Sequence, residues 1–199
     1  MTALDRRPIE RSELLATCRE SAYELFDAEC RLDEMLGDGY FQTKHRGFAA
    51  LIKRFQAEGQ ERIARFERVF TRLDTPPRRH ISRSVVAIVA AGEIRADQTH
   101  KERLRDLALL EVLLRIKHYS VAGYDLLIGM ADTLKKSETS RLLIKSYEEE
   151  VLAIDAIMSL GEVSFYGELA VVGQLEETRT RTISTENQSQ EKASEKNSE

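Results

Sequence analysis

The sequence contains few of the residues that interrupt helices or cross-link chains. Its 199 residues include three prolines, ten glycines, two cysteines and no tryptophan. Because proline and glycine most often break helices, their scarcity leaves room for long uninterrupted helices. Cys18 and Cys30 lie on one predicted helix, about 18 Å apart along its axis, whereas a disulfide needs Cα atoms within about 7 Å. We therefore expect two unpaired thiols, which are typical of a reducing compartment.

The sequence also lacks a long hydrophobic run and an excess of either charge. Its longest apolar stretches, residues 84–91 and 107–114, are too short to cross a bilayer. The first eight residues include Asp5, Arg6 and Arg7 and no apolar run, which argues against a signal peptide. The net charge of −4 comes from interleaved residues of both signs, so we expect neither nucleic acid nor a membrane as a partner. Together these features predict a cytoplasmic protein.

What the sequence does contain is a series of helical patterns. Apolar residues recur at spacings of three and four over four long segments, which predicts an all-α fold built as an antiparallel four-helix bundle within residues 9–161. The helices are expected at about 9–36 (starting at Ile9 or Ser12), 43–73, 99–134 and 137–161. Residues 78–97 are expected to form a crossover with a short apolar helix at 81–94.

The two ends of the chain have a different composition from the bundle. Residues 1–8 are predicted to form an N-terminal arm, and residues 162–173 fit either a short extra helix or an extended arm. Residues 174–199 are rich in Glu, Thr, Ser, Gln, Lys and Asn. Such a segment cannot bury enough apolar area to offset its ordering entropy, which predicts a disordered polar tail.

Each predicted apolar stripe is interrupted by a polar residue. Glu29 interrupts the first helix, Glu149 interrupts the fourth, and Glu58 adjoins Gly59 in the second. The stripe of the third helix reads Leu104, Leu107, Glu111, Leu114, His118, Val121 and Asp125. Buried carboxylates need a partner, and bundle cores build di-metal sites from one inward carboxylate per helix. The candidate metal ligands are Glu29, Glu58, His118 and Glu149, with iron or manganese as the expected ion.

The same residues also have ordinary structural explanations. Glu111 and Arg115 are four residues apart and can form a surface pair. The acidic run at 148–150 can be a solvated face, and His118 can be a core histidine bonded to a carbonyl or a tyrosine. The basic residues at 78–83 can form a solvated loop or an anion site. Glu-x-x-His, Cys-x-x-Cys and phosphate-binding glycine loops are absent from the sequence, and the lack of a complete catalytic motif argues against enzymatic activity without excluding it.

Three segments resemble the YciE/YciF-type ferritin-like proteins, small bacterial helical bundles associated with stress responses. Residues 25–29 (Leu-Phe-Asp-Ala-Glu) resemble the family's Leu-Tyr-Asp-Ala-Glu, and residues 65–70 (Arg-Phe-Glu-Arg-Val-Phe) resemble Arg-Leu-Glu-x-Val-Phe. Residues 115–124 (Arg-Ile-Lys-His-Tyr-Ser-Val-Ala-Gly-Tyr) give the most specific match, to Arg-Val-Glu-His-Tyr-Glu-Ile-Ala-Gly-Tyr. The resemblance covers about residues 23–157 and implies a ferritin-like bundle with a di-metal carboxylate site.

The chain departs from the family pattern at positions that would serve such a site. The family has Glu where this chain has Lys117 and again where it has Ser120, and Phe55 replaces the histidine of a His-x-x-Glu-Thr motif. A lysine near the site would repel a cation. A second hypothesis is therefore a degenerate site without an ion, in which Lys117 supplies the positive charge. Its expected partners are Glu29, Glu58 and Glu149.

Two functions follow from these observations. The first is a stress-associated ferritin-like protein with an altered or degenerate metal site. The second is a metal-free helical scaffold that self-associates or binds a protein partner. In both cases we expect a homo-oligomer, with the dimer as the expected form.

Overall fold

The computed structural model describes residues 9–167. These residues form five α-helices and one π-helical turn and include no strand, which confirms the all-α prediction. The elements are α1 (Arg11–Gly37), α2 (Arg46–Arg72), α3 (Arg83–Asp97), α4 (Glu102–Thr133), α5 (Ser137–Gly161) and the π-helical turn η1 (Glu162–Tyr166). The predicted N-terminal arm at 1–8 and the predicted polar tail at 174–199 lie outside the described residues.

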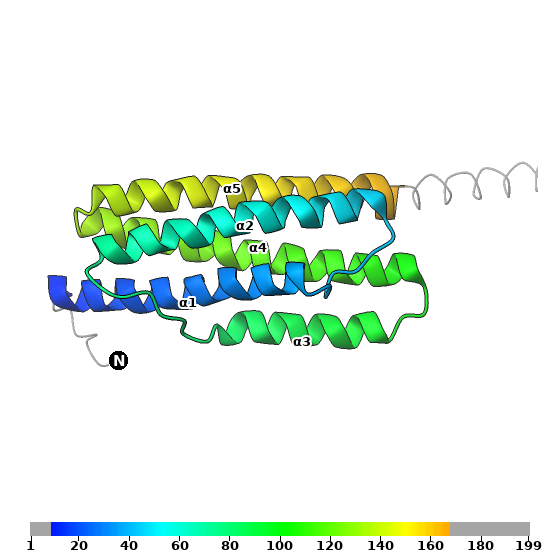
Figure 1. Ribbon diagram of the computed structural model, residues 1–199, viewed down its shortest axis with the longest axis horizontal. Helices are drawn as coiled ribbons and strands as arrows, with labels where there is room; N and C mark the ends of the chain where they lie inside the picture. The colour runs from blue at the N-terminus through cyan, green and yellow to red at the C-terminus, as the bar shows by residue number, and fades with distance from the viewer. Residues whose placement is uncertain (1–8, 168–199) are drawn as a thin grey trace, which may run out of the picture. The chain divides into compact units, whose positions relative to one another are not determined.

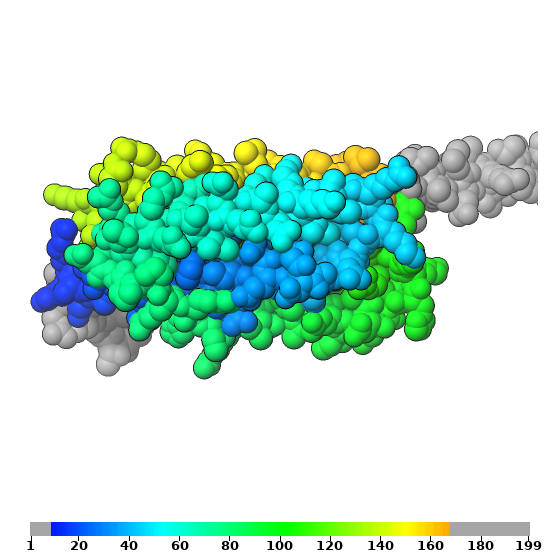
Figure 2. Space-filling view, in the orientation of Figure 1, coloured from blue at the N-terminus to red at the C-terminus, as the bar shows by residue number. Residues whose placement is uncertain are grey.

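The described residues up to Met158 form one compact unit, in which four long helices surround a common core. Helix α1 packs against α2 and α4, and α5 reaches α2 and α4 through ion pairs. Neighbouring helices of this ring run antiparallel, while α2 and α4 run in the same direction (Figure 1). The chain therefore needs a long crossover between α2 and α4, and α3 lies within it and packs against α4. Figure 2 shows α1 and α2 side by side on one face of this unit.

Local backbone chemistry places the helix ends within a few residues of the predicted ones. Glu10 caps α1 through a reciprocal capping box with Glu13, so α1 begins between the two predicted starts, Ile9 and Ser12. Two residues after the last residue of α2 and of α4 lies a residue with positive φ, Asp74 at 56° and Lys135 at 59°. A left-handed residue at this position lets the last carbonyls of a helix find donors in the following turn.

The core of the unit is rich in aromatic side chains from α2. Phe55, Phe66 and Phe70 are at most 1% exposed. The ring of Phe66 lies 5.8 Å from that of Phe70 and 5.9 Å from that of Tyr124, so α2 and α4 meet through aromatic contacts. These phenylalanines recur at helical spacing and mark the inward face of α2, but Arg62 rather than Ile63 is buried between Phe55 and Phe66.

The predicted inward face of α4 is wrong. Leu104, His118 and Asp125 are exposed rather than buried. The buried row along this part of α4 consists of Lys117, Ser120, Tyr124, Leu127 and Ala131. Residues 107–116 are apolar on nearly every side, so their spacing does not decide which side faces the core. A similar one-residue error affects α5, whose buried glutamate is Glu150 instead of Glu149.

Residues from Ser159 onward form a second unit, of which the structure describes 159–167. Helix α5 ends at Gly161, and Glu162–Tyr166 continues as a π-helical turn. The described part of the 162–173 extension is therefore helical rather than extended. Among all described residues, no helix combines the length and the apolar character needed to span a membrane.

Candidate functional site

The four predicted metal ligands do not come together. Glu29 is buried in α1 at 1% exposure, whereas His118 is exposed on α4. Glu58 lies at the surface of α2, where one of its oxygens is 3.3 Å from Arg54 Nε. Glu149 is 24% exposed. Within residues 9–167, no group of three or more His, Cys, Asp or Glu side chains is placed to hold a metal ion.

Two cations and two carboxylates meet at the centre of the bundle instead. Glu29 from α1, Arg62 from α2, Lys117 from α4 and Glu150 from α5 form what we call the core ionic cluster, with one member from each helix of the ring. Each of these side chains is at most 1% exposed. The structure thus brings Glu29 into a cluster with three residues that were not among the predicted ligands.

The contacts within the core ionic cluster are short. Arg62 Nε donates to Glu29 Oε2 at 3.1 Å. Arg62 Nη2 lies 2.8 Å from Glu150 Oε1, an ion-pair contact that lacks hydrogen-bond geometry. Lys117 Nζ donates to the same Glu150 oxygen at 2.7 Å. Each carboxylate is therefore paired with a cation from a neighbouring helix, and Arg62 connects the two carboxylates.

Uncharged side chains complete the surroundings of the cluster. The Tyr124 hydroxyl donates to Glu29 Oε1 at 3.0 Å, so both oxygens of Glu29 accept a hydrogen bond. The Lys117 ammonium lies 5.0 Å from the centre of the Phe55 ring, within cation–π range. Glu150 Oε2 and Ser120 Oγ are buried and have no hydrogen-bond partner among the described residues.

A second ion pair adjoins the cluster between α2 and α5. Arg65 donates to both oxygens of Glu149, at 3.0 and 2.8 Å, and also donates to Ser146 Oγ at 2.6 Å. Glu149 Oε2 also lies 3.8 Å from Arg62 Nη1. A bidentate arginine and a metal ion would compete for the same carboxylate oxygens. In this structure Glu149 is held by Arg65.

The core ionic cluster contains two cations and two carboxylates, and these charges help to shift the pKa of both carboxyl groups. Burial by itself raises the pKa of Glu29, but the charges of Arg62 and Lys117 and the donated hydrogen bonds outweigh it, so the pKa is lowered. For Glu150, burial together with repulsion from Glu29 outweighs the nearby cations, so the pKa is raised. Burial raises the pKa of Tyr124 well above its ordinary value, which keeps the phenol a neutral donor.

A di-metal centre does not fit this arrangement. The carboxylates of Glu29 and Glu150 already face an ammonium and a guanidinium, and an ion between them would meet two positive charges at close range. The arrangement favours the second hypothesis, in which Lys117 supplies the positive charge. Its partner, however, is Glu150 and none of the three predicted carboxylates, because α5 turns Glu150 inward. The bound metal stays an untested prediction.

Sequence reasoning missed Arg62 and Glu150, although a signal for both exists. Arg62 continues the spacing of four, three and four that links Phe55, Gly59 and Phe66 on the inward face of α2. Glu150 lies in the same way on the buried row of α5, which consists of Leu143, Ser146, Glu150, Ala153 and Ile157. A charged residue inside an apolar row predicts a buried ion pair when another helix carries a residue of opposite charge inside its own apolar row.

Three of the four basic residues at 78–83 contact carboxylates of α1, and only Arg83 makes no salt bridge among the described residues. Asp27 on α1 is 1% exposed and accepts hydrogen bonds from Arg79 Nε at 2.8 Å, Arg31 Nε at 2.6 Å and the Ser82 backbone N–H at 2.9 Å. Burial raises the pKa of Asp27, but the three hydrogen bonds more than compensate, so the pKa is lowered. Asp27 therefore fixes the start of α3 to α1.

These features define a class of protein: an all-α bundle with one crossover helix and an ion-paired core. The chain belongs to the family DUF892, a domain of unknown function, whose model matches residues 23–193. No curated protein matches the chain.

Two solved structures are similar in fold. The E. coli stress protein YciF has a TM-score of 0.69 and 20% sequence identity, and the alignment covers 74% of this chain and 93% of that one. YcfI from Rhodopseudomonas palustris has a TM-score of 0.69 and 21% identity, with 78% and 97% covered. These findings confirm the YciF-type resemblance that was predicted from the sequence.

Proposed function

We propose that this chain is a stress-associated, ferritin-like scaffold protein that works without a metal centre and self-associates. The single observation that carries the proposal is the pairing of Lys117 with Glu150 and of Arg62 with Glu29, at 2.7 and 3.1 Å. Arg62 and Lys117 thus supply positive charge in the part of the core where a bundle with a carboxylate metal site would bind its ions. A single long crossover is also the connection found in ferritin-like bundles. The stress-related role rests on the likeness to the stress protein YciF.

The core ionic cluster has a role that suits a scaffold. A buried ion pair adds little net stability compared with apolar residues of the same size, because both charges lose their hydration. Breaking one, in contrast, is strongly unfavourable. Since the core ionic cluster takes one residue from each helix of the ring, only the correct alignment of all four helices satisfies it. We infer that it selects the arrangement of the bundle.

Metal analysis tests this proposal directly. Protein purified without chelator should contain far less than one iron or manganese ion per chain, and chelation should leave the melting temperature unchanged, because no ligand of the native state is lost. Glu29→Gln should lower the melting temperature equally with and without chelator, since Arg62 loses one of its two buried carboxylate partners. Glu58→Gln, at the surface of α2, is the matched control and should change little. A stoichiometric ion that Glu29→Gln removes would overturn the proposal.

A further inference from the structure

Helix α3 has an apolar side that no described part of the chain covers. Its inward side packs against α4, where a Cβ at Gly92 would collide with the Val112 side chain. On the outward side, Val86 is 44% exposed and Ile94 is 61% exposed. We call this side the α3 stripe; it consists of Arg83, Val86, Ala87, Ala90, Ile94 and Asp97, all exposed.

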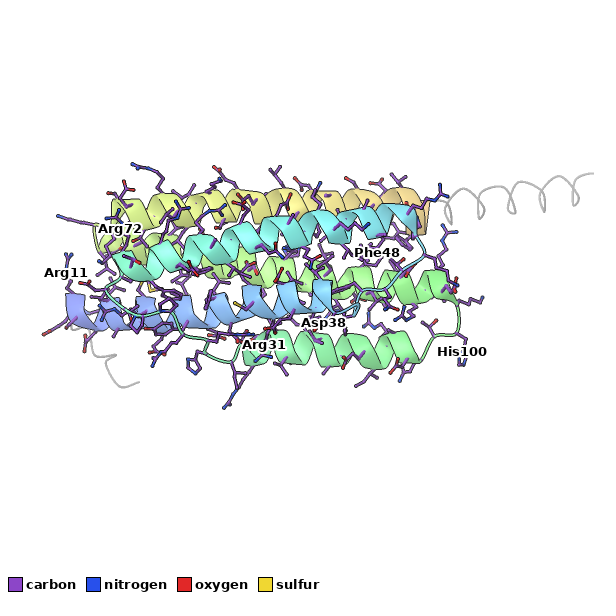
Figure 3. All side chains as sticks on the ribbon, viewed as in Figure 1. Arg11, Arg31, Asp38, Phe48, Arg72 and His100 are labelled. Atoms are coloured by element: carbon purple, nitrogen blue, oxygen red, sulfur yellow. The ribbon has the colours of Figure 1, made fainter. Side chains whose placement is uncertain are left out.

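The α3 stripe borders a groove between α3 and the end of α1. The groove has a volume of about 630 Å³, and its apolar lining includes Met35, Tyr40 and Val89. Arg31 and Asp38 lie along its α1 side, as their positions beside α3 in Figure 3 show. An apolar floor with charges along its edge is the composition of a protein–protein contact.

Two charges at the ends of α3, Arg83 and Asp97, are unfavourable for the helix itself, whereas Arg95 in the last turn is favourably placed and pairs with Glu111. Arg83 is the first residue and Asp97 the last, and the first turn contains no acidic residue. The helix dipole favours the opposite placement, with acidic residues at the N-terminus and basic residues at the C-terminus. Neither Arg83 nor Asp97 forms a salt bridge within residues 9–167. Both charges are therefore available to an oppositely charged group of a partner.

We propose that the α3 stripe binds the α3 stripe of a second copy of this chain, with the two helices antiparallel about a two-fold axis at Ala90. Two pairs of stripe residues are symmetric about this point, Arg83 with Asp97 and Val86 with Ile94, whereas Ala87 lies opposite position 93 of the second copy. Val86 then faces the partner's Ile94, and Arg83 faces the partner's Asp97, twice in each dimer. The small side chains of Ala87 and Ala90 let the two helices approach closely at the centre.

A second copy explains the stripe better than an unrelated helix does. An unrelated helix would need to match one apolar row and two end charges of opposite sign, whereas antiparallel self-pairing satisfies all of them by symmetry. The inference rests on the proposed self-association and adds the surface that carries it. At 1.5 Å per residue, the helix is about 22 Å long, and the groove beside it enlarges the contact.

The oligomeric state of the full chain tests the surface. Sedimentation equilibrium at micromolar concentration should give a dimer, and Ile94→Glu should give a monomer with an unchanged far-UV circular dichroism spectrum. Leu126→Glu on α4 is the matched control, because Leu126 is 60% exposed and lies outside the stripe. It should stay dimeric. A monomeric wild type would overturn both the self-association and the surface, whereas a dimer that survives Ile94→Glu would overturn only the surface.

A charge exchange tests the antiparallel register. Arg83→Glu and Asp97→Arg should each raise the dissociation constant of the dimer about tenfold, because like charges then meet at both ends of the helix pair. The double variant places opposite charges together again and should restore the wild-type dissociation constant. A double variant that binds no better than the two single ones would overturn this register.

Discussion

Replacing Lys117 by methionine tests the core ionic cluster most directly. Methionine has a similar length and keeps the apolar stem packed, but it removes the ammonium that lies 2.7 Å from Glu150 Oε1. Glu29 and Glu150 then share the single guanidinium of Arg62, and the buried cluster carries a net negative charge. The matched variant is Lys117→Met combined with Glu150→Gln, which restores neutrality and leaves the pair of Arg62 and Glu29 intact.

The expected magnitudes follow from the burial of both partners. Lys117 and Glu150 are each 0% exposed, so the loss of one partner should lower the free energy of unfolding by about 3–5 kcal/mol. The charge-balanced double variant should recover roughly 2–3 kcal/mol of this loss, which is the coupling expected for contacting residues. In a domain of this size, the single variant should melt roughly 10 °C lower.

The coupling is measured by denaturant unfolding of the wild type, both single variants and the double variant. The pH dependence of the unfolding free energy adds an independent check. Without Lys117, the pKa of Glu150, already raised by burial, rises further. A carboxyl whose folded-state pKa lies above its unfolded value stabilises the fold below the unfolded pKa and loses this contribution as pH rises through the folded pKa. Lys117→Met should therefore regain stability relative to the wild type as the pH falls.

Two results would refute this reasoning. A loss below about 1 kcal/mol for Lys117→Met would mean that the ammonium does not balance a buried charge. A double variant that loses the full sum of the two single losses would mean that Lys117 and Glu150 are not coupled.

Two further predictions concern the placement of α3. Gly92→Ala should destabilise by about 1–3 kcal/mol, since its Cβ would collide with Val112, whereas Gly129→Ala, with no neighbour within 4 Å, should be neutral or stabilising in thermal unfolding. Asp27→Asn should lower the unfolding free energy by about 2 kcal/mol at neutral pH, because it weakens the bonds to Arg31, Arg79 and Ser82. The wild-type contribution of Asp27, whose pKa is lowered, is present above the unfolded pKa and lost as pH falls through the folded one, so the difference between variant and wild type should shrink in acid.

The sequence alone was sufficient for the helical architecture and for part of the core. The spacing of three and four along α1 and α2, with large residues such as Phe55 and Phe66 on one side only, leaves a single face that can be buried. The scarcity of proline and glycine confines the helix ends to a few sites, and the segment at 115–124 points to the YciF type. These properties are local, so no information about distant contacts is needed to read them.

The tertiary structure alone decided which charged residues enter the core. Residues 107–116 are apolar on nearly all sides, and only packing against α1 and α5 turns Lys117 inward and His118 outward. A lysine or arginine in a helix has the same local pattern whether it meets solvent or a buried carboxylate. Its burial is favourable only if neighbouring helices bring opposite charges within hydrogen-bond distance. For Arg62 and Lys117, that condition is met by Glu29 and Glu150, which come from other helices and meet them only when the bundle is assembled.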